Sequence, residues 1–117
     1  MKIPAAVLSI ALLALTACHS YHIDTTVENQ TGGAIQLLEV EYPSASFGAD
    51  TLAPGATLNY RIQVRGSGPL KVQYTGSDRQ LRQIEGPMLT EHLEGQFEIV
   101  LLPQGRAEFN PHLIPHS

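Results

Sequence analysis

The sequence predicts an all-β fold, an antiparallel β-sandwich of about seven short strands that forms one domain over residues 18–117. Apolar residues recur at every second position in several segments, which is the pattern of half-buried strands. Clusters of Gly, Pro, Asn and Ser separate these segments, and ten glycines and eight prolines suit many turns. A chain of 117 residues also favours a single domain with one modest core.

Four segments alternate clearly between apolar and polar residues: 21–28, 57–65, 70–75 and 96–102. Successive side chains of a strand point to opposite faces, so each segment is expected to have one buried and one wet face. Ala107 and Phe109 share one face of a further strand at the end of the chain. The side chains expected in the core from these alternating segments include Leu58, Tyr60, Ile62, Val72 and Phe97.

The segment 34–42 changes parity, because Ile35 and Leu37 share one face while Leu38, Val40 and Tyr42 share the other. A β-bulge near Leu37-Leu38 would bring both sets to the core, since one extra residue reverses the faces.

The remaining segments are less regular. Residues 80–84 form a weak strand, and 43–56 and 85–95 are expected to be irregular connections, the second with a helical turn around 89–93. Pro103-Gln104-Gly105 predicts a three-residue hairpin with glycine in the left-handed region.

The run Leu52-Ala53-Pro54-Gly55 stands directly ahead of the alternating segment 57–65. Together with the strand pattern, it resembles the immunoglobulin-like modules that are common in bacterial envelope proteins. That resemblance implies an immunoglobulin-like sandwich. A small antiparallel barrel is the alternative.

The N-terminal residues have the layout of a signal peptide. Lys2 is followed by an uncharged, mostly apolar run over 5–17, which is too short for a transmembrane helix. The run Leu15-Thr16-Ala17-Cys18 resembles the lipobox of bacterial lipoprotein precursors. This resemblance implies that residues 1–17 form a signal helix that is removed, and that the Cys18 thiol becomes acylated. An ordinary secretory signal with a chance cysteine is the alternative.

Acylated Cys18 would hold the chain at a membrane by its lipid, since each buried methylene contributes about 0.8 kcal/mol. His19, rather than Asp, follows the cysteine. By resemblance to the enterobacterial sorting rule, this favours the outer membrane, facing the periplasm, in a Gram-negative cell. The first expected strand begins so soon after Cys18 that the tether spans only about 10 Å.

The charge balance excludes one class of partner. Without Lys2, six Lys/Arg stand against eleven Asp/Glu, whereas a nucleic-acid binder needs an excess of cations to displace counterions from phosphates. No nucleic acid is therefore expected as a partner, and an envelope protein is the candidate macromolecular partner.

Histidines supply the candidate metal ligands. His19 and His22 at one end, and His112 and His116 at the other, could each offer two imidazoles to Cu or Zn. Each pair lacks a third ligand nearby, so solvated histidines are the simpler interpretation and no cofactor is expected.

Two weaker patterns complete the candidates. His92 with a distant Asp could be assembled as a catalytic pair, but no nucleophile motif accompanies it. Arg61, Arg65 and Lys71 fall on the outward faces of two strands expected to form a hairpin, where they would make a small basic patch.

The sequence therefore predicts a non-catalytic, membrane-anchored envelope lipoprotein that acts as a binding or structural module. A periplasmic lipoprotein that handles Cu or Zn is the alternative, and an enzyme is the third hypothesis.

Overall fold

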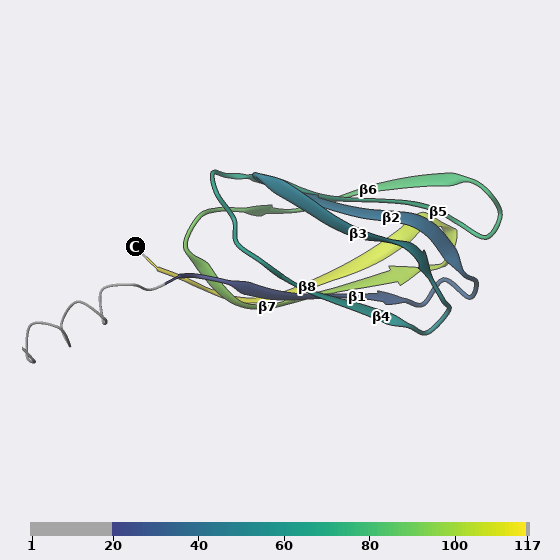
Figure 1. The fold of residues 1–117 in the computed structure, drawn as a ribbon, viewed down its shortest axis with the longest axis horizontal. Coiled ribbons are helices and arrows are strands. Elements are labelled where there is room, and N and C mark those ends of the chain that lie inside the picture. Colours follow the sequence, from purple (N-terminus) through teal and green to yellow (C-terminus); the bar gives the residue numbers. More distant parts are fainter. Residues whose placement is uncertain (1–19, 117) are drawn as a thin grey trace, which may run out of the picture.

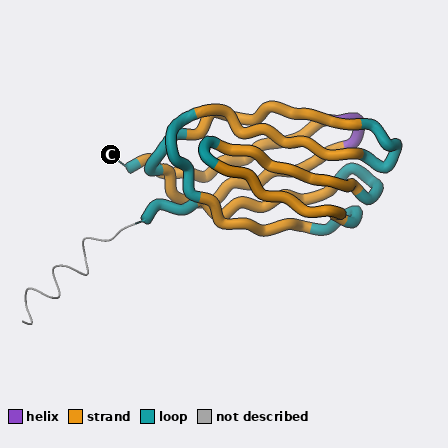
Figure 2. Tube along the Cα trace, turned by 45° about the horizontal axis from the view of Figure 1, so that its top comes forward, coloured by secondary structure: helices purple, strands orange, loops and turns teal. Residues whose placement is uncertain are grey.

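The computed structural model describes residues 20–116, which form eight strands and one short 3-10 turn (Figures 1 and 2). The elements in chain order are β1 (Ile23–Asn29), β2 (Ile35–Tyr42), β3 (Ala45–Leu52), β4 (Thr57–Ile62), β5 (Gly68–Thr75), β6 (Leu81–Leu89), β7 (Leu93–Leu102), η1 (Pro103–Gly105) and β8 (Arg106–Pro115). The predicted signal peptide, Cys18 and His19 lie outside the described residues. Among residues 20–116, no helix is long and apolar enough to cross a membrane.

The strands form two four-stranded sheets, with the orders β4-β1-β7-β8 and β3-β2-β5-β6. The chain passes to the other sheet after β1, β3, β4 and β6, while β2–β3, β5–β6 and β7–β8 are hairpins within a sheet. The all-β prediction is confirmed, with eight strands in place of about seven. The expectation of a purely antiparallel fold is wrong, because β1 runs parallel to β7 from Ile23 opposite Gly95 to Asn29 opposite Leu101.

The core lies between the two sheets and is built from the inward positions of their strands. Of the side chains predicted to be buried, Ile62, Val72 and Phe97 are each 1% exposed, which confirms their assignment. Leu58 is partly buried against the core. The prediction is wrong for Tyr60, which is 48% exposed because β4 is the edge strand of its sheet.

Aromatic side chains close the sandwich along both sides. Phe47 of β3 stacks on Tyr60 of β4, with centroids 4.8 Å apart and planes at 15°, so Tyr60 caps one side instead of filling the core. On the other side, Phe109 of β8 lies against Gly86 of β6, where an added Cβ would come within 2.9 Å of the ring. Each edge strand is thus joined to the edge of the opposite sheet.

The predicted bulge is present in β2. The register against β5 shifts between Gln36 and Glu39, and Leu37 has a φ of 52°. Ile35 and Leu38 therefore both face the core, as expected, but Leu37 itself points outward and is 65% exposed. The extra residue of a bulge is the one left out of the ladder.

Two segments expected to be irregular are strands. Residues 43–56 contain β3, which pairs antiparallel with β2 along its whole length. Residues 81–89 form β6, so the expected helical turn around 89–93 is wrong. The alternation of apolar and polar residues in β6 is interrupted at Gly86-Pro87, because the register against β5 shifts there.

The connections between strands lie at two opposite ends of the sandwich. β1 begins and β8 ends at the same end, since Ile23 lies opposite Gly95 and Leu93 lies opposite Pro115 (Figure 1). The β1–β2 loop, the β5–β6 turn and η1 gather at the other end (Figure 2). We call these two ends the terminal end and the loop end.

Candidate functional site

The terminal end holds a cluster of rings from distant parts of the chain. Tyr21 stacks on His116, with centroids 4.7 Å apart and planes at 22°, and meets His92 edge-on at 5.3 Å. His116 Nε2 lies 3.1 Å from Glu94 Oε1, and the His116 amide donates to the His92 carbonyl at 2.9 Å. The residues before β1 are therefore packed against the residue that follows β8.

The candidate metal ligands do not form a metal site in the described residues. His112 and His116 lie four positions apart along extended chain, which separates them by about 13 Å. His22 accepts a hydrogen bond from the Gly95 amide through its backbone carbonyl. Within residues 20–116, no group of three or more His, Cys, Asp or Glu side chains is placed to hold a metal ion.

The expected basic patch is not formed, because the two strands are not a hairpin. Arg61 is on β4 of one sheet and Lys71 is on β5 of the other. Arg61 Nε donates to Asp24 Oδ1 at 2.9 Å across the β1–β4 pair, and both side chains are more than half exposed. Arg65 lies in the connection between the two sheets.

A small polar pocket lies at the loop end, and we call it the loop-end pocket. Its volume is about 110 Å³. Three connections and the ends of β5, β6 and β7 line it, through Thr31, Tyr74, Gly76, Ser77, Asp78, Arg82, Leu102, Pro103, Gln104 and Gly105. The pocket therefore combines segments from both sheets.

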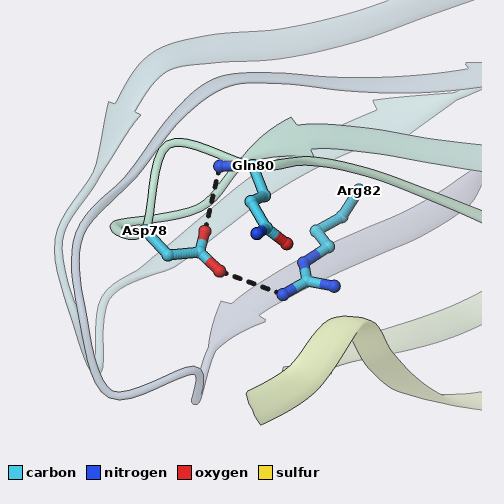
Figure 3. A network of polar contacts seen from close by, with 3 residues as sticks. All are labelled: Asp78, Gln80 and Arg82. Carbon is cyan, nitrogen blue, oxygen red and sulfur yellow. Dashed lines mark hydrogen bonds and ion pairs between the residues drawn. The ribbon is translucent and has the colours of Figure 1, made fainter.

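The β5–β6 turn fixes one wall of this pocket (Figure 3). The Gln80 amide donates to Asp78 Oδ1 at 3.0 Å, and Arg82 Nη2 donates to Asp78 Oδ2 at 3.0 Å. The Gly76 amide donates to the Gln80 carbonyl at 2.9 Å, which closes the turn. The Gln80 amide, and then the Arg82 guanidinium, hold the pKa of Asp78 below its usual range, so this carboxylate stays ionised.

Arg82 points inward from the edge strand β6 and lies across the opening between the two sheets at the loop end. It lies directly opposite Tyr74 in the β5–β6 register, on the face that packs toward the core. Gly105 of η1 has a φ of 71°, and a Cβ there would come within 3.1 Å of Arg82 Cδ. The absence of a Cβ at Gly105 therefore leaves room for the aliphatic part of the Arg82 side chain. The predicted Pro103-Gln104-Gly105 turn forms part of the pocket wall.

Tyr74 contributes a hydroxyl group to the loop-end pocket. The residue is 2% exposed, and its side chain lines the pocket beside Asp78 and Arg82. Burial raises the pKa of Tyr74, and this effect outweighs the opposing charge of Arg82. The hydroxyl therefore keeps its proton and can donate it in a hydrogen bond to a bound molecule.

The wall formed by the β1–β2 loop is held by a buried asparagine. Asn29 is fully buried and donates through Nδ2 to the carbonyls of Gly33 at 2.8 Å and Leu52 at 3.0 Å. Its Oδ1 accepts from the Thr31 amide at 3.0 Å and from the Thr31 hydroxyl at 2.7 Å. Ser77 packs against Gly33, where a Cβ would clash with it. Hydrogen bonds and close packing thus hold the loop in this conformation.

A larger hollow, of about 400 Å³, lies on the outer face of the β2-β5-β6 layer. It is a furrow between exposed side chains of a sheet surface, and it includes Glu39, Glu41, Lys71 and Glu85. The loop-end pocket is smaller, but of the two it alone is lined by Tyr74 and by the Asp78–Arg82 ion pair.

Sequence reasoning did not find the loop-end pocket. The signals were Asp78 two residues before Gln80, which is typical of an Asx turn, and Arg82 at an inward position of a strand. The candidate pairing of His92 with an Asp is not formed with Asp78, since His92 follows β6 at the terminal end.

No protein-family model matches the chain, and no curated protein matches it. A solved structure described as "NMR structure of the protein from Eubacterium rectale" is similar, with a TM-score of 0.56 and 13% sequence identity. The match covers 82% of this chain and 90% of that chain. At this identity the likeness concerns the fold alone.

Proposed function

We propose that this chain is the precursor of a lipid-anchored envelope protein whose β-sandwich is a non-catalytic binding module, with the loop-end pocket as its recognition site. The lipobox resemblance of Leu15-Thr16-Ala17-Cys18 supports the anchor. The Leu52–Gly55 turn ahead of β4 supports an immunoglobulin-like affiliation within the sandwich class.

The observation that carries this proposal is the position of the pocket relative to the predicted anchor. β1 starts at Ile23, so the chain from Cys18 to β1 spans at most about 17 Å. The ring cluster around Tyr21 packs this segment against the end of β8. A strand as long as β7 extends over about 30 Å, so the loop-end pocket would face away from the membrane.

The groups in the pocket suit binding better than proton transfer. The pKa of Asp78 is held low and the pKa of Tyr74 is raised, so one stays ionised and the other stays protonated near neutral pH. A general acid or base works best with a pKa near the working pH. Both groups therefore act as fixed hydrogen-bonding partners.

The orientation can be tested with two single-cysteine variants of the full chain, Arg106→Cys near the loop end and Arg65→Cys at the terminal end. The only native cysteine is Cys18, which acylation would block, so a fluorescent maleimide would label the new thiol alone. In vesicles with quencher-bearing lipids, the label at position 65 should be quenched strongly and the label at position 106 weakly. Equal quenching, or labelling of the unmodified protein at Cys18, would contradict the proposal.

A further inference from the structure

We propose that the loop-end pocket binds an uncharged, polyhydroxylated ligand through two adjacent hydroxyl groups, the chemistry of a saccharide unit. This inference rests on the proposed binding function and specifies its ligand class.

The ion pair between Asp78 and Arg82 presents an acceptor and donors side by side. Each oxygen of the Asp78 carboxylate accepts one hydrogen bond, from Gln80 or from Arg82, and has a second lone pair for another. The guanidinium of Arg82 has five N–H donors, of which one bonds to Asp78. A vicinal diol can donate one hydroxyl to the carboxylate and accept with the other from the guanidinium.

The charge of the pocket favours a neutral ligand. Among the described residues that line it, the charged ones are Asp78 and Arg82, and they neutralise each other. An anion at the free donors of Arg82 would be repelled by the Asp78 carboxylate beside it, and a cation at the free lone pairs of Asp78 would be repelled by the Arg82 guanidinium. A hydroxyl group can use both partners and leave their ion pair intact.

The Tyr74 hydroxyl adds a third polar group to the pocket. Tyr74 is 2% exposed, and its raised pKa keeps the hydroxyl protonated as a hydrogen-bond donor. It lines the same pocket as the ion pair, where a third hydroxyl of a bound ring could accept a hydrogen bond from it. The 110 Å³ volume equals the share of about three or four water molecules, enough for one edge of a sugar ring.

Protection of an edge strand is another use for Arg82. An inward-pointing charge on an edge strand such as β6 discourages pairing with other chains. That role needs the charge alone, and it gives no part to Tyr74 of the neighbouring strand, which lines the same pocket. The two explanations predict different results in a binding experiment.

The experiment uses the acylated full-length protein, purified in a detergent without a sugar or phosphate headgroup, and nuclear magnetic resonance of its amide and Arg Nε–H signals. The probes are cis-1,2-cyclohexanediol, cyclohexanol, methyl glycosides of glucose, galactose and mannose, and sodium acetate. We expect saturable shifts confined to residues 76–82 and 103–105 with the diol and with at least one glycoside. For ligands of this size a low-millimolar Kd is expected, about 1–10 mM.

Two substitutions and a matched control complete the test. Tyr74→Phe removes only the hydroxyl, and Arg82→Gln removes the guanidinium, and each should weaken glycoside binding about fivefold or more, the loss of one hydrogen bond. Arg61→Gln breaks the exposed Arg61–Asp24 pair on β4 and should leave binding unchanged. Spectra of the free variants show whether each is folded, and either substitution in the pocket alone suffices for the comparison.

Equal shifts with cyclohexanol and the diol would overturn the assignment, as would saturable binding of acetate in place of the glycosides. Acetate binding would leave the loop-end pocket as a recognition site, so the proposed function would stand while the ligand class failed. No saturable shift with any probe would also reject the ligand class, and the vesicle experiment would then decide separately on the orientation of the domain.

Discussion

Tyr74 and Arg82 face each other across the β5–β6 pair on the inner face of their sheet, at the point where the sandwich opens between its loops. A tyrosine and an arginine at neighbouring inward positions place two polar groups at the border of an apolar core. The turn anchored by Asp78 holds the arginine there, at 3.0 Å from the carboxylate. The consequence is a polar opening in a domain whose core is otherwise closed by Phe47, Tyr60 and Phe109.

Replacement of the predicted lipidation site should release the protein from the membrane. We expect Cys18→Ala to abolish incorporation of labelled palmitate and to move the protein to the soluble fraction, because lipid would otherwise hold it in place. Cell fractionation with radiolabel or click detection measures both. A variant that stays labelled and membrane-bound would contradict the predicted anchor, and Ser20→Ala is the control.

A cavity in the core should cost substantial stability. Ile62 is 1% exposed and belongs to the core between the sheets, so Ile62→Ala should lower the free energy of unfolding by about 2–5 kcal/mol. Leu81 is 58% exposed, and Leu81→Ala should change the free energy by less than about 0.5 kcal/mol. Urea denaturation measures both, and similar losses in the two variants would argue against the observed core.

Loss of the Tyr21 ring should loosen the terminal end without unfolding the domain. Stacked aromatic pairs contribute about 0.5–1.5 kcal/mol, so Tyr21→Ala should have a small effect on global stability. The larger effect should be local, as faster hydrogen exchange at the amides of Gly95 and His116, which donate to His22 and His92. Unchanged exchange at both amides would show that the ring does not hold this end together.

The turn at Asp78 should make stability depend on acid pH. The Gln80 amide, and then Arg82, hold the pKa of Asp78 below its ordinary value of 3.8. A carboxyl group whose pKa is lower in the folded state contributes stability that is present above the ordinary pKa and lost as pH falls through the folded pKa. The melting temperatures of wild type and Asp78→Asn should therefore differ at pH 7 and converge as the pH is lowered below 3.8. A difference that stays constant down to the lowest pH at which the domain remains folded would contradict this linkage.

Metal ions should not stabilise the described domain specifically. His112 in β8 and His116 after it lie too far apart along extended chain to share one ion, so micromolar Cu or Zn should not raise the melting temperature. A native site would add about 2.7 kcal/mol at a hundredfold excess over its Kd. A clear upward shift that disappears in the His22→Ala, His112→Ala double variant would favour the metal-handling alternative instead.

Strands with regular alternation could be predicted from the sequence, including the edge strand β4, whereas β3 and most of β6, the two edges of the other sheet, could not. Ile62 and Phe97 belong to simple alternating runs, and the parity change at Leu37-Leu38 was sufficient to predict a bulge. β3 contains Gly48 and Asp50, which are rare in strands, and it is held by its pairing with β2 instead of by its own preference.

The loop-end pocket could not be predicted because its parts come together only through the order of the strands. Thr31, Asp78 and Gln104 belong to three connections that lie far apart in the chain, and the two sheets bring them to one end. Nothing in the local sequence fixes which strand lies next to which. The Pro103-Gln104-Gly105 turn was predicted correctly as a turn, but its contact with Arg82 depends on the packing of the two sheets.

The position of β1 has a consequence for how the chain acquires its fold. β1 lies inside its sheet, between β4 and β7, and its parallel partner β7 is one of the last strands in the chain. Such distant contacts close large loops, so they form slowly and late. The edge of β1 that pairs with β7 therefore stays unpaired until almost the whole domain has been synthesised. A chain that ends before Leu93 would keep β4 as the only neighbour of β1, and it would expose the apolar side chains of Ile23 and Val27.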